Sequence, residues 1–531
     1  MSKTVQFVEE TLRNGNLSLW ATRMDTRTML GVAGVIDRAG FQRACVSSGA
    51  AFDTAIRFLR EDPWDRLRLL RGEMKSTPLE FLVRGRNLIG WKRYPDDVAA
   101  LMIRCLRRVG IDWMLIFDAL NDFRNIAFHI RYAKEQGLKV SAYLSYSVSP
   151  VHTDEYWVRK ATELVDLGVD VVQLGDPAGL LNVKRADALI PALLNAVKER
   201  AELMLCVHTS TGQGHACYKV GMQHGVRSFA TTALPLSNSE SLPATTDMFE
   251  CVAALGFEHN VDPALATEID HYFSYVAMRD DKQVGRPVQY DDADYQRYLQ
   301  HQIPGGMISN FIKQHTEAGT LSRFPEILEE MGRVRAELGY PVMVTPFSQL
   351  VGVQATLNVM GGERYGTVPD ELKLYVRGHY GEIPGRVDAN VLDRILAEGD
   401  REPLDAAAID SDEWMPKLRA QNVFVSDEEL ALRIFYEPST LEAYRAAMKP
   451  IDRFSVVKTP LSALIQAALS SGRAQPISLK IPSDVSSLSY ADARDALQIV
   501  RSASEDSNLN LFLPAFSLSL NWQNSSADQA V

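Results

Sequence analysis

Between Thr4 and Leu236 the chain repeats one unit: a short apolar run, a polar turn, and a stretch in which apolar residues recur with helical spacing. Eight apolar runs occur there, at residues 5–8, 44–47, 79–83, 113–117, 140–144, 171–174, 203–207 and 228–234. Strands that alternate with helices pair in parallel through right-handed crossovers. Eight units in roughly 240 residues are enough to close a barrel. The pattern therefore predicts an α/β fold, a (β/α)8 TIM barrel over residues 1–300. An open, doubly wound sheet is less favoured, because no GxGxxG motif follows the first strand.

After Tyr290 the strand-like runs become rare and helical spacing predominates. Amphipathic helices are predicted at residues 324–338, 348–360, 370–377, 391–397 and 427–448. They indicate a mostly helical C-terminal domain over residues 301–450. From Ile451 the sequence becomes rich in serine, and residues 508–520 alternate weakly as a strand would. We expect residues 451–531 to form a small appendage whose last residues, 524–531, are disordered.

Composition narrows the class of protein. The chain has 531 residues, 46% of them hydrophobic, and a formal net charge of −11 without a long basic run, which argues against nucleic-acid binding. The five cysteines are odd in number and form no CxxC motif, so we expect neither a disulfide framework nor a zinc knuckle. Charges near Met1 and the lack of an unbroken apolar run of about 18 residues argue against a signal peptide and a membrane span. These features predict a soluble protein of the reducing cytoplasm.

Polar residues follow several of the predicted strands. The first strand leads to Arg13 and Arg23, the third to Arg84, and the fourth to Asp118 and Asp122. In a TIM barrel the carboxyl ends of all strands meet at one mouth, where the active site lies. Arg13 and Arg84 are therefore candidates to bind a carboxylate, since a guanidinium matches two oxygens at once. Alternatively, these arginines cap backbone carbonyls or pair with Asp118 or Asp122.

Strands six and seven also end in polar, glycine-bearing turns, Val-Val-Gln-Leu-Gly-Asp-Pro-Ala-Gly at 171–179 and Leu-Cys-Val-His-Thr-Ser-Thr-Gly at 205–212. They bring Asp176, Cys206 and His208 toward the same mouth. From the residues alone, Cys206 is best explained as a small buried core residue. His208 is either a structural hydrogen-bonding group or a contact to substrate.

Ordered motifs along residues 5–450 resemble the carboxyltransferase components of biotin-dependent enzymes. These components include the oxaloacetate decarboxylase α subunit, the transcarboxylase pyruvate subunit and the carboxyltransferase domain of pyruvate carboxylase. The motifs are Arg-Gly-x-Asn-Leu-x-Gly from Arg84, Phe-Asp-Ala-Leu-Asn-Asp from Phe117, Leu-Gly-Asp-Pro-Ala-Gly from Leu174, His-Gln-Ile-Pro-Gly-Gly-Met from His301, Val-Thr-Pro-Phe-Ser-Gln-Leu-Val-Gly from Val344 and Gly-Glu-Arg-Tyr from Gly362. The resemblance implies a TIM barrel followed by a helical domain that covers the barrel mouth.

The metal site of that family is altered here. In the family a divalent ion is held by an aspartate, a carbamylated lysine on strand six and a His-x-His pair on strand seven. This chain has Asn14 in place of the aspartate, Gly175 in place of the lysine, and Cys206 and His208 in place of the histidine pair. A register shifted by two would give His208 and Ser210 instead. Both anionic ligands are missing, and Mg²⁺ or Mn²⁺ relies on such oxygens. We therefore expect no divalent metal, with Cys206 and His208 the only retained candidate ligands.

Other positions concern the substrate. Leu17 replaces a glutamine and Trp91 replaces a tyrosine that lie near the keto acid in relatives, so a different or bulkier substrate is expected. Arg84 and Thr345 are kept; in the family the threonine shuttles a proton between biotin and the enol, and the arginine orients the substrate. A threonine before a proline is otherwise an ordinary turn residue. The positions at the barrel mouth and the resemblance together predict three catalytic residues and five that contact substrate. The catalytic residues are Thr345, Arg84 and His208, and the contacts are Arg13, Arg23, Trp91, Leu17 and Asp176.

No biotinyl domain is evident, because Ala-Met-Lys at 447–449 closes a helical segment and is not flanked by glycine-rich strands. Any carboxybiotin would come from a separate biotin carrier protein. The sequence predicts an enzyme, a homodimer without nucleic-acid or membrane partners, that makes or breaks a C–C bond next to the carbonyl of a 2-oxo or β-carboxy acid. Carboxyl transfer, decarboxylation and aldol-type cleavage would all proceed through an enolate, stabilised by arginines in place of a metal. The alternative is a non-catalytic scaffold or regulatory homologue.

Overall fold

The computed structural model describes residues 3–90, 92–396, 402–404, 406–448, 477–480, 508–513 and 516–521. Its centre is a closed barrel of eight parallel strands, in which β1 pairs with both β2 and β8. The strands are β1 (Thr4–Glu9), β2 (Arg43–Ser48), β3 (Leu79–Val83), β4 (Trp113–Ile116), β5 (Lys139–Ser145), β6 (Val171–Asp176), β7 (Glu202–Val207) and β8 (Ser228–Thr231). The predicted TIM barrel is confirmed. The eighth predicted run extended too far, because η5 (Leu234–Leu236), a 3-10 turn, follows β8. A short strand, β9 (Glu258–His259), pairs with β1 outside the barrel.

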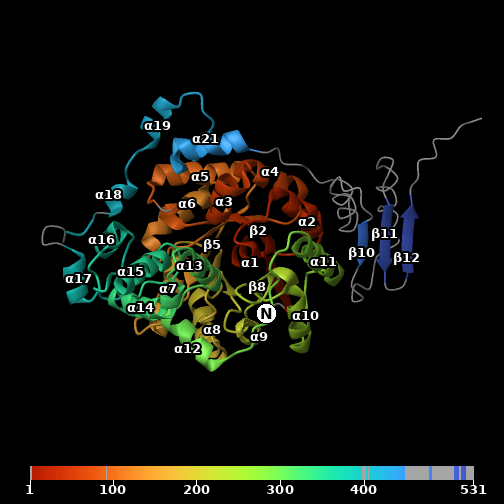
Figure 1. The fold of residues 1–531 in the computed structure, drawn as a ribbon, viewed down its shortest axis with the longest axis horizontal. Helices are drawn as coiled ribbons and strands as arrows, with labels where there is room; N and C mark the ends of the chain where they lie inside the picture. Colours follow the sequence, from red (N-terminus) through yellow and green to blue (C-terminus); the bar gives the residue numbers. More distant parts are fainter. Residues whose placement is uncertain are drawn as a thin grey trace, which may run out of the picture.

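Helices surround this barrel (Figure 1). The main ones are α2 (Thr26–Arg38), α4 (Pro63–Glu73), α5 (Asp96–Arg108), α6 (Ala127–Glu135), α7 (Asp154–Asp166), α8 (Val183–Val197), α9 (Gly214–His224), α10 (Thr245–Ala254) and α11 (Pro263–Arg279). Several begin where a side chain accepts a hydrogen bond from the first turn, as Asp25, Thr153 and Asn182 do. Shorter pieces, α1 (Asn16–Leu19), α3 (Gly49–Thr54) and the turns η1 (Thr11–Gly15), η2 (Ala55–Leu59), η3 (Gly85–Asn87) and η4 (Phe123–Ile126), form the loops at the strand ends.

The inside of the barrel holds charged as well as apolar side chains. Val171, Met204 and Cys206 belong to its apolar cluster. Within the same barrel Arg43 and Glu80 form an ion pair with Nε and Oε1 2.8 Å apart, and neither side chain is exposed. Such a pair is stable only when its charges are matched, because both have lost their water. The barrel interior is therefore a filled core with polar contacts.

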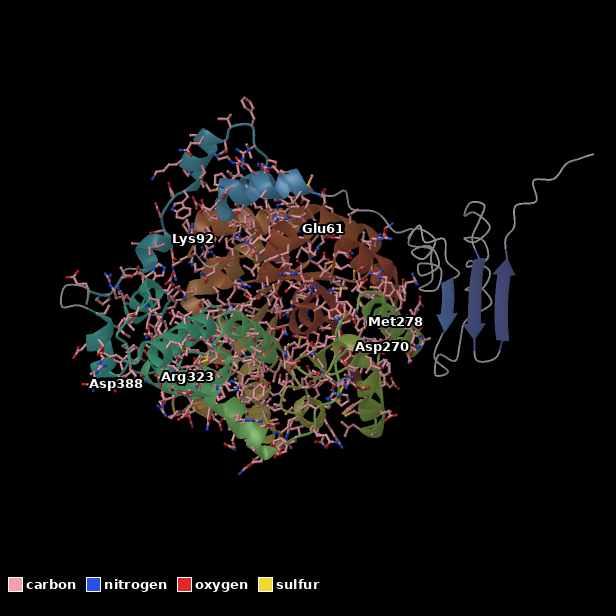
Figure 2. The ribbon with its side chains drawn as sticks, in the orientation of Figure 1. Glu61, Lys92, Asp270, Met278, Arg323 and Asp388 are labelled. Carbon is pink, nitrogen blue, oxygen red and sulfur yellow. The ribbon has the colours of Figure 1, made fainter. Side chains whose placement is uncertain are left out.

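A second set of helices covers one side of the barrel: α12 (Asp292–His301), α13 (Gly305–Glu317), α14 (Phe324–Glu337), α15 (Phe347–Gly361), α16 (Asp370–Val376) and α17 (Ala389–Ile395), with the turn η6 (Leu321–Arg323) before α14. Their apolar core includes Ile303, Met331 and Phe347, and it also takes in Ala119 and Leu120 from the loop after β4. The cover is thus anchored directly on the barrel mouth. In Figure 2, Arg323 and Asp388 mark this cover, across the molecule from Asp270 and Met278 of α11.

The remaining helices pack elsewhere. They are α18 (Ala406–Asp410), α19 (Met415–Gln421), α20 (Asp427–Phe435) and α21 (Pro438–Ala447). Leu430 and Leu441 join the core between the barrel and its outer helices. Figure 1 shows α21 on the outer side of the barrel helices. The single helix predicted over 427–448 is wrong, because Pro438 begins a new helix and the residue before a proline disfavours helical geometry. The predicted helical region 301–450 is therefore divided between two packing surfaces.

At the C-terminal end, β10 (Ile477–Lys480), β11 (Asn508–Leu513) and β12 (Phe516–Asn521) form a separate three-stranded sheet. The strand predicted at 508–520 is two antiparallel strands, with Leu509 opposite Leu520. Residues 524–531, predicted to be disordered, lie outside the described residues. Among the described residues no helix has the length and apolar character needed to cross a membrane.

Candidate active site

A cavity of about 350 Å³ lies at the barrel mouth, between the strand ends and the helical cover. Most of the residues that the sequence singled out lie on its wall, although they come from distant parts of the chain. They are Arg13, Leu17, Arg23, Arg84, Gly175, Asp176, Cys206 and Thr345. Pro304, Met307 and Val344 contribute the wall on the side of the cover. The cavity therefore forms only when barrel and cover are assembled.

Arg13 is buried at the end of β1, and its partners lie on the barrel side of the cavity. Nη2 donates to Glu10 at 3.0 Å and to the hydroxyl of Tyr143 at 3.1 Å. Burial by itself would lower the pKa of Arg13, but Glu10, with smaller contributions from the neighbouring Tyr143, Cys45 and Cys206, raises the pKa well above its ordinary value. The alternative that Arg13 pairs with Asp118 or Asp122 is not realised, because its guanidinium bonds Glu10 and Tyr143. Asp122 is bound instead by Arg124, at 2.7 Å.

Tyr143 occupies the space beside Gly175. A Cβ atom added at Gly175 would lie 2.3 Å from Cδ1 of the Tyr143 ring, far inside van der Waals contact. A lysine at this position, as in the family's metal site, would therefore collide with the ring. The phenol hydroxyl lies 3.4 Å from the sulfur of Cys206 and accepts a hydrogen bond from Arg13. Burial raises the pKa of Tyr143 well above its ordinary value, so the hydroxyl keeps its proton.

The donor atoms at the family's metal position do not suit a divalent ion. Asn14 offers an amide, and its Nδ2 donates to the Cys206 sulfur at 3.9 Å. Burial raises the pKa of Cys206 to about 12, so the thiol is protonated near neutral pH. Nδ1 of His208 lies 2.6 Å from the carbonyl oxygen of Glu240, which occupies that ring nitrogen. An amide, a protonated thiol and one imidazole provide no anionic oxygen for Mg²⁺ or Mn²⁺.

Within the described part of the chain, one group of three potential metal ligands lies close enough together to share an ion: Glu10, Cys45 and Glu80, all buried. Glu10 is paired with Arg13, however, and Glu80 with Arg43. Two guanidinium groups thus already balance the two carboxylates. The geometry favours an ion-pair network inside the barrel over a metal site.

Arg84 and Arg23 lie on another part of the wall. Arg84 follows β3, and its Nη1 donates to the carbonyl oxygen of Gly90 at 3.5 Å. This contact agrees with the alternative prediction that Arg84 caps a backbone carbonyl. Burial lowers the pKa of Arg84, which means that its charge would gain from an anionic ligand. The guanidinium of Arg23 stacks over the Phe58 ring, with Cζ 3.7 Å from the ring centroid.

Thr345 is contributed by the cover, just before α15. Its hydroxyl accepts a hydrogen bond from Nε2 of Gln349 at 3.4 Å, which leaves the hydroxyl proton available for donation. A narrow recess of about 20 Å³ adjoins the main cavity, and Arg84, Phe117 and Thr345 line both spaces. Arg84 and Thr345 therefore lie at the junction of the two, the place where a substrate would contact both.

Two of the remaining predicted residues are Asp176, which lines the cavity, and His208, which does not. Asp176 is fully buried at the end of β6, where Oδ2 accepts from the backbone N–H of Leu181 at 2.6 Å, and burial raises its pKa to about 6. His208 is buried, is not among the residues that line the cavity, and has a pKa lowered by burial to about 4. The imidazole is therefore neutral near pH 7, and the contact of His208 with substrate stays a prediction. Trp91 lies outside the described residues.

Sequence reasoning missed Tyr143 and Glu10. Both point into the barrel near a strand end, and the alternation of strand β5 does place Tyr143 on the inward face with Ser141 and Ser145. That pattern could have identified Tyr143 as a mouth residue. Nothing in it indicates that the ring would fill the space above Gly175.

Comparison with known proteins finds carboxylases and carboxyltransferases. The family described as a conserved carboxylase domain matches residues 299–473. A pyruvate carboxylase subunit of Methanothermobacter thermautotrophicus is 37% identical over 466 residues, which cover 86% of this chain and 79% of that protein. The methylmalonyl-CoA carboxyltransferase 5S subunit of Propionibacterium freudenreichii is 33% identical over 402 residues, 76% of this chain and 78% of that protein.

A solved structure agrees with these matches. The carboxyl transferase domain of Rhizobium etli pyruvate carboxylase, with pyruvate and biocytin, superposes with a TM-score of 0.77 at 26% identity. The match covers 84% of this chain and 78% of that domain.

Proposed function

The chain belongs to the carboxyltransferase family of the biotin-dependent carboxylases, and we propose that it moves a carboxyl group to or from the carbon next to the carbonyl of a 2-oxo acid. One observation carries the proposal: Arg84, from the barrel, and Thr345, from the cover, both line the main cavity and its recess. An anion-binding group and a hydroxyl that can carry a proton thus border the same space. These are the two functions that such a reaction requires of the protein.

Arg84 would bind and orient the acid. Its planar guanidinium can donate two parallel hydrogen bonds to one carboxylate, which fixes both the position and the rotation of the substrate. The lowered pKa of Arg84 supports this role, since a bound carboxylate would offset the cost of burying the charge. Arg23, on the same wall, would add to the positive potential of the cavity.

Thr345 would carry the proton. In the decarboxylation direction, the bond between the β-carboxyl carbon and its neighbour breaks, and its electron pair remains on the substrate as an enolate. The carboxyl group leaves to its acceptor, and the proton that this acceptor releases passes through the Thr345 hydroxyl to complete the new C–H bond. Carboxylation runs the same changes in reverse: the C–H proton passes through Thr345 to the group that gives up the carboxyl, and the enolate carbon forms the C–C bond.

We propose that carboxybiotin, on a separate carrier protein, supplies the carboxyl group when bound. Leu17, Met307 and Val344 share the cavity with Thr345, and these apolar side chains suit the mostly apolar rings of biotin. The solved relative with pyruvate and biocytin supports the same pairing of substrate and carrier group. We further propose that the reaction needs no divalent ion, because the donor set around Asn14, Gly175 and Cys206 does not suit one.

A decarboxylation assay tests the proposal. The purified chain is incubated with a panel of β-carboxy 2-oxo acids, oxaloacetate among them, with and without biocytin, and release of the product 2-oxo acid is followed by NMR. We expect turnover of at least one acid that survives EDTA and is stimulated by biocytin. Turnover that is lost in EDTA and restored by a divalent ion would contradict the metal-free part. If no acid is turned over or bound, the non-catalytic scaffold becomes the better explanation.

A further inference from the structure

The Tyr143 hydroxyl is the polar group that occupies the altered metal site. It lies 3.1 Å from Nη2 of Arg13 and 3.4 Å from the sulfur of Cys206, and its residue lines the cavity. Since Arg13 has no lone pair to offer, the hydroxyl must accept that hydrogen bond, and its own proton points elsewhere. The Cys206 sulfur, 3.4 Å away, is a weak acceptor for that proton, and an oxygen atom of a ligand in the cavity would be a stronger one.

The position of this hydroxyl is closely fixed. Gly175 lets the ring lie against the backbone of β6, because any side chain there would collide with it. On the other side, Arg13 is itself held by Glu10, at 3.0 Å and from within the buried core. A donor held on two sides does not need to reorganise when charge develops on a nearby oxygen, which is what makes such a group effective.

The surroundings of the hydroxyl also favour a neutral donor over an ion. Tyr143 retains its proton because burial raises its pKa, and the adjacent Cys206 thiol is protonated for the same reason. Arg13 polarises the phenol through the hydrogen bond that it donates. The group therefore presents an O–H donor, reinforced by a guanidinium, at the place where relatives carry the metal ligands.

Resting on the function proposed above, we infer that Tyr143 is a catalytic residue whose hydroxyl donates a hydrogen bond to the enolate oxygen of the substrate. It performs the charge stabilisation for which the family uses a divalent ion. Arg84 binds the carboxylate, Thr345 carries the proton, and Tyr143 stabilises the negative charge on the carbonyl oxygen. No covalent bond to Tyr143 is made, and its proton stays on the phenol.

Tyr143→Phe is the main test, because it removes the hydroxyl and keeps the ring that fills the space above Gly175. We expect turnover to fall by about 100-fold, the usual loss for one oxyanion donor. Affinity for oxalate, a planar mimic of the enolate, should fall about tenfold by calorimetry, and Mg²⁺, Mn²⁺ or Zn²⁺ should restore neither property. Tyr218→Phe is the matched control: that hydroxyl is also buried, but it donates to the Ala230 carbonyl outside the cavity.

A second variant covers the case in which Tyr143→Phe does not fold. Fluorotyrosine incorporated at position 143 keeps both ring and hydroxyl and makes that hydroxyl a stronger hydrogen-bond donor. Oxalate affinity should therefore rise above that of the wild type. An unchanged or lower oxalate affinity contradicts the inference, as do wild-type turnover and oxalate affinity in Tyr143→Phe.

Failure of the proposed function has a different signature. If the wild-type chain turns over no acid but binds oxalate in a way that Tyr143→Phe weakens, the proposed reaction is wrong and Tyr143 remains the donor to a bound oxyanion. If oxalate binding requires an added divalent ion, or is the same in both proteins, the inference about Tyr143 is wrong whatever the reaction proves to be.

Discussion

Two parts of the cavity wall differ in how their polar groups are satisfied. At the ends of β1, β5 and β7, Arg13, Tyr143 and Cys206 are joined to one another by hydrogen bonds, and Glu10 neutralises the arginine. At the junction with the recess, Arg84 lies 3.5 Å from the carbonyl oxygen of Gly90, and the Thr345 hydroxyl accepts from Gln349 at 3.4 Å. The first part is linked internally by hydrogen bonds, whereas the second brings one residue of the barrel and one of the cover to the same cavity.

This difference indicates how a carboxyltransferase site can change without losing its framework. Replacement of anionic ligands by Asn14 and Gly175 would leave a void and unpaired polar groups, and both are costly in a protein interior. The Tyr143 ring fills the space, and its hydroxyl satisfies Arg13.

Thr345→Ala tests the junction most severely. If the hydroxyl carries the proton, turnover should fall by about 100-fold or more while oxalate affinity and folding stay close to those of the wild type. If Thr345 only shapes the turn before Pro346, turnover should be nearly intact. Thr356→Ala is the control, since that hydroxyl bonds the Gly352 carbonyl at 2.8 Å within α15. Steady-state kinetics on the identified acid separates the two outcomes.

Gly175→Ala tests the part that is linked by hydrogen bonds. The added methyl group would lie 2.3 Å from the Tyr143 ring, so the free energy of unfolding should fall by about 3 kcal/mol. In a Tyr143→Ala background the same change should cost little, because the obstructing ring is gone. Denaturant titration of the four proteins measures this coupling. Gly72→Ala, where nothing lies within 4 Å, serves as the control and should not destabilise. Additive effects of the two changes would show that the ring does not fill this space.

Asp176→Asn tests the electrostatics of the β6 end. Burial raises the pKa of Asp176 to about 6, above its ordinary value of 3.8. A raised pKa means that the contribution of this group to stability is fully present below about pH 4 and is lost as the pH rises through 6. Relative to Asp176→Asn, the wild type should therefore lose about 2 kcal/mol between pH 4 and pH 7. Unfolding titrations across this range would count against the prediction if the difference stayed constant or changed sign.

Arg84→Lys has the smallest expected effect. The charge is kept, but an ammonium cannot donate two parallel hydrogen bonds to one carboxylate, so substrate affinity should weaken about tenfold. Arg104→Lys is a suitable control, because Arg104 bonds Tyr132 on the outer helices at 3.0 Å. Equal affinity in Arg84→Lys and the wild type, measured by calorimetry, would mean that a single charge suffices and that the two-point grip is absent.

The sequence by itself determined the barrel. Each strand and each flanking helix shows its own period of apolar residues, and caps such as Asp25 and Thr153 mark helix starts within a few residues. The rule that parallel strands end at one mouth then brings Arg13, Arg84 and Asp176 to one place. The helices and strands depend on residues that are close in sequence, and the shared mouth follows from the number and order of the strands. Both can be read from the sequence.

Only the tertiary structure decided what happens between elements. Glu10 binds Arg13 in preference to Asp118 or Asp122 because of how the turn after β1 folds back, and Tyr143 fills the space above Gly175 because β5 and β6 pair with Ser145 opposite Gly175. The helices α19 to α21 pack on the barrel's outer face, away from the core of the cover. Such choices depend on the shapes and charges of residues far apart in the chain, and local periodicity is the same whichever partner is chosen.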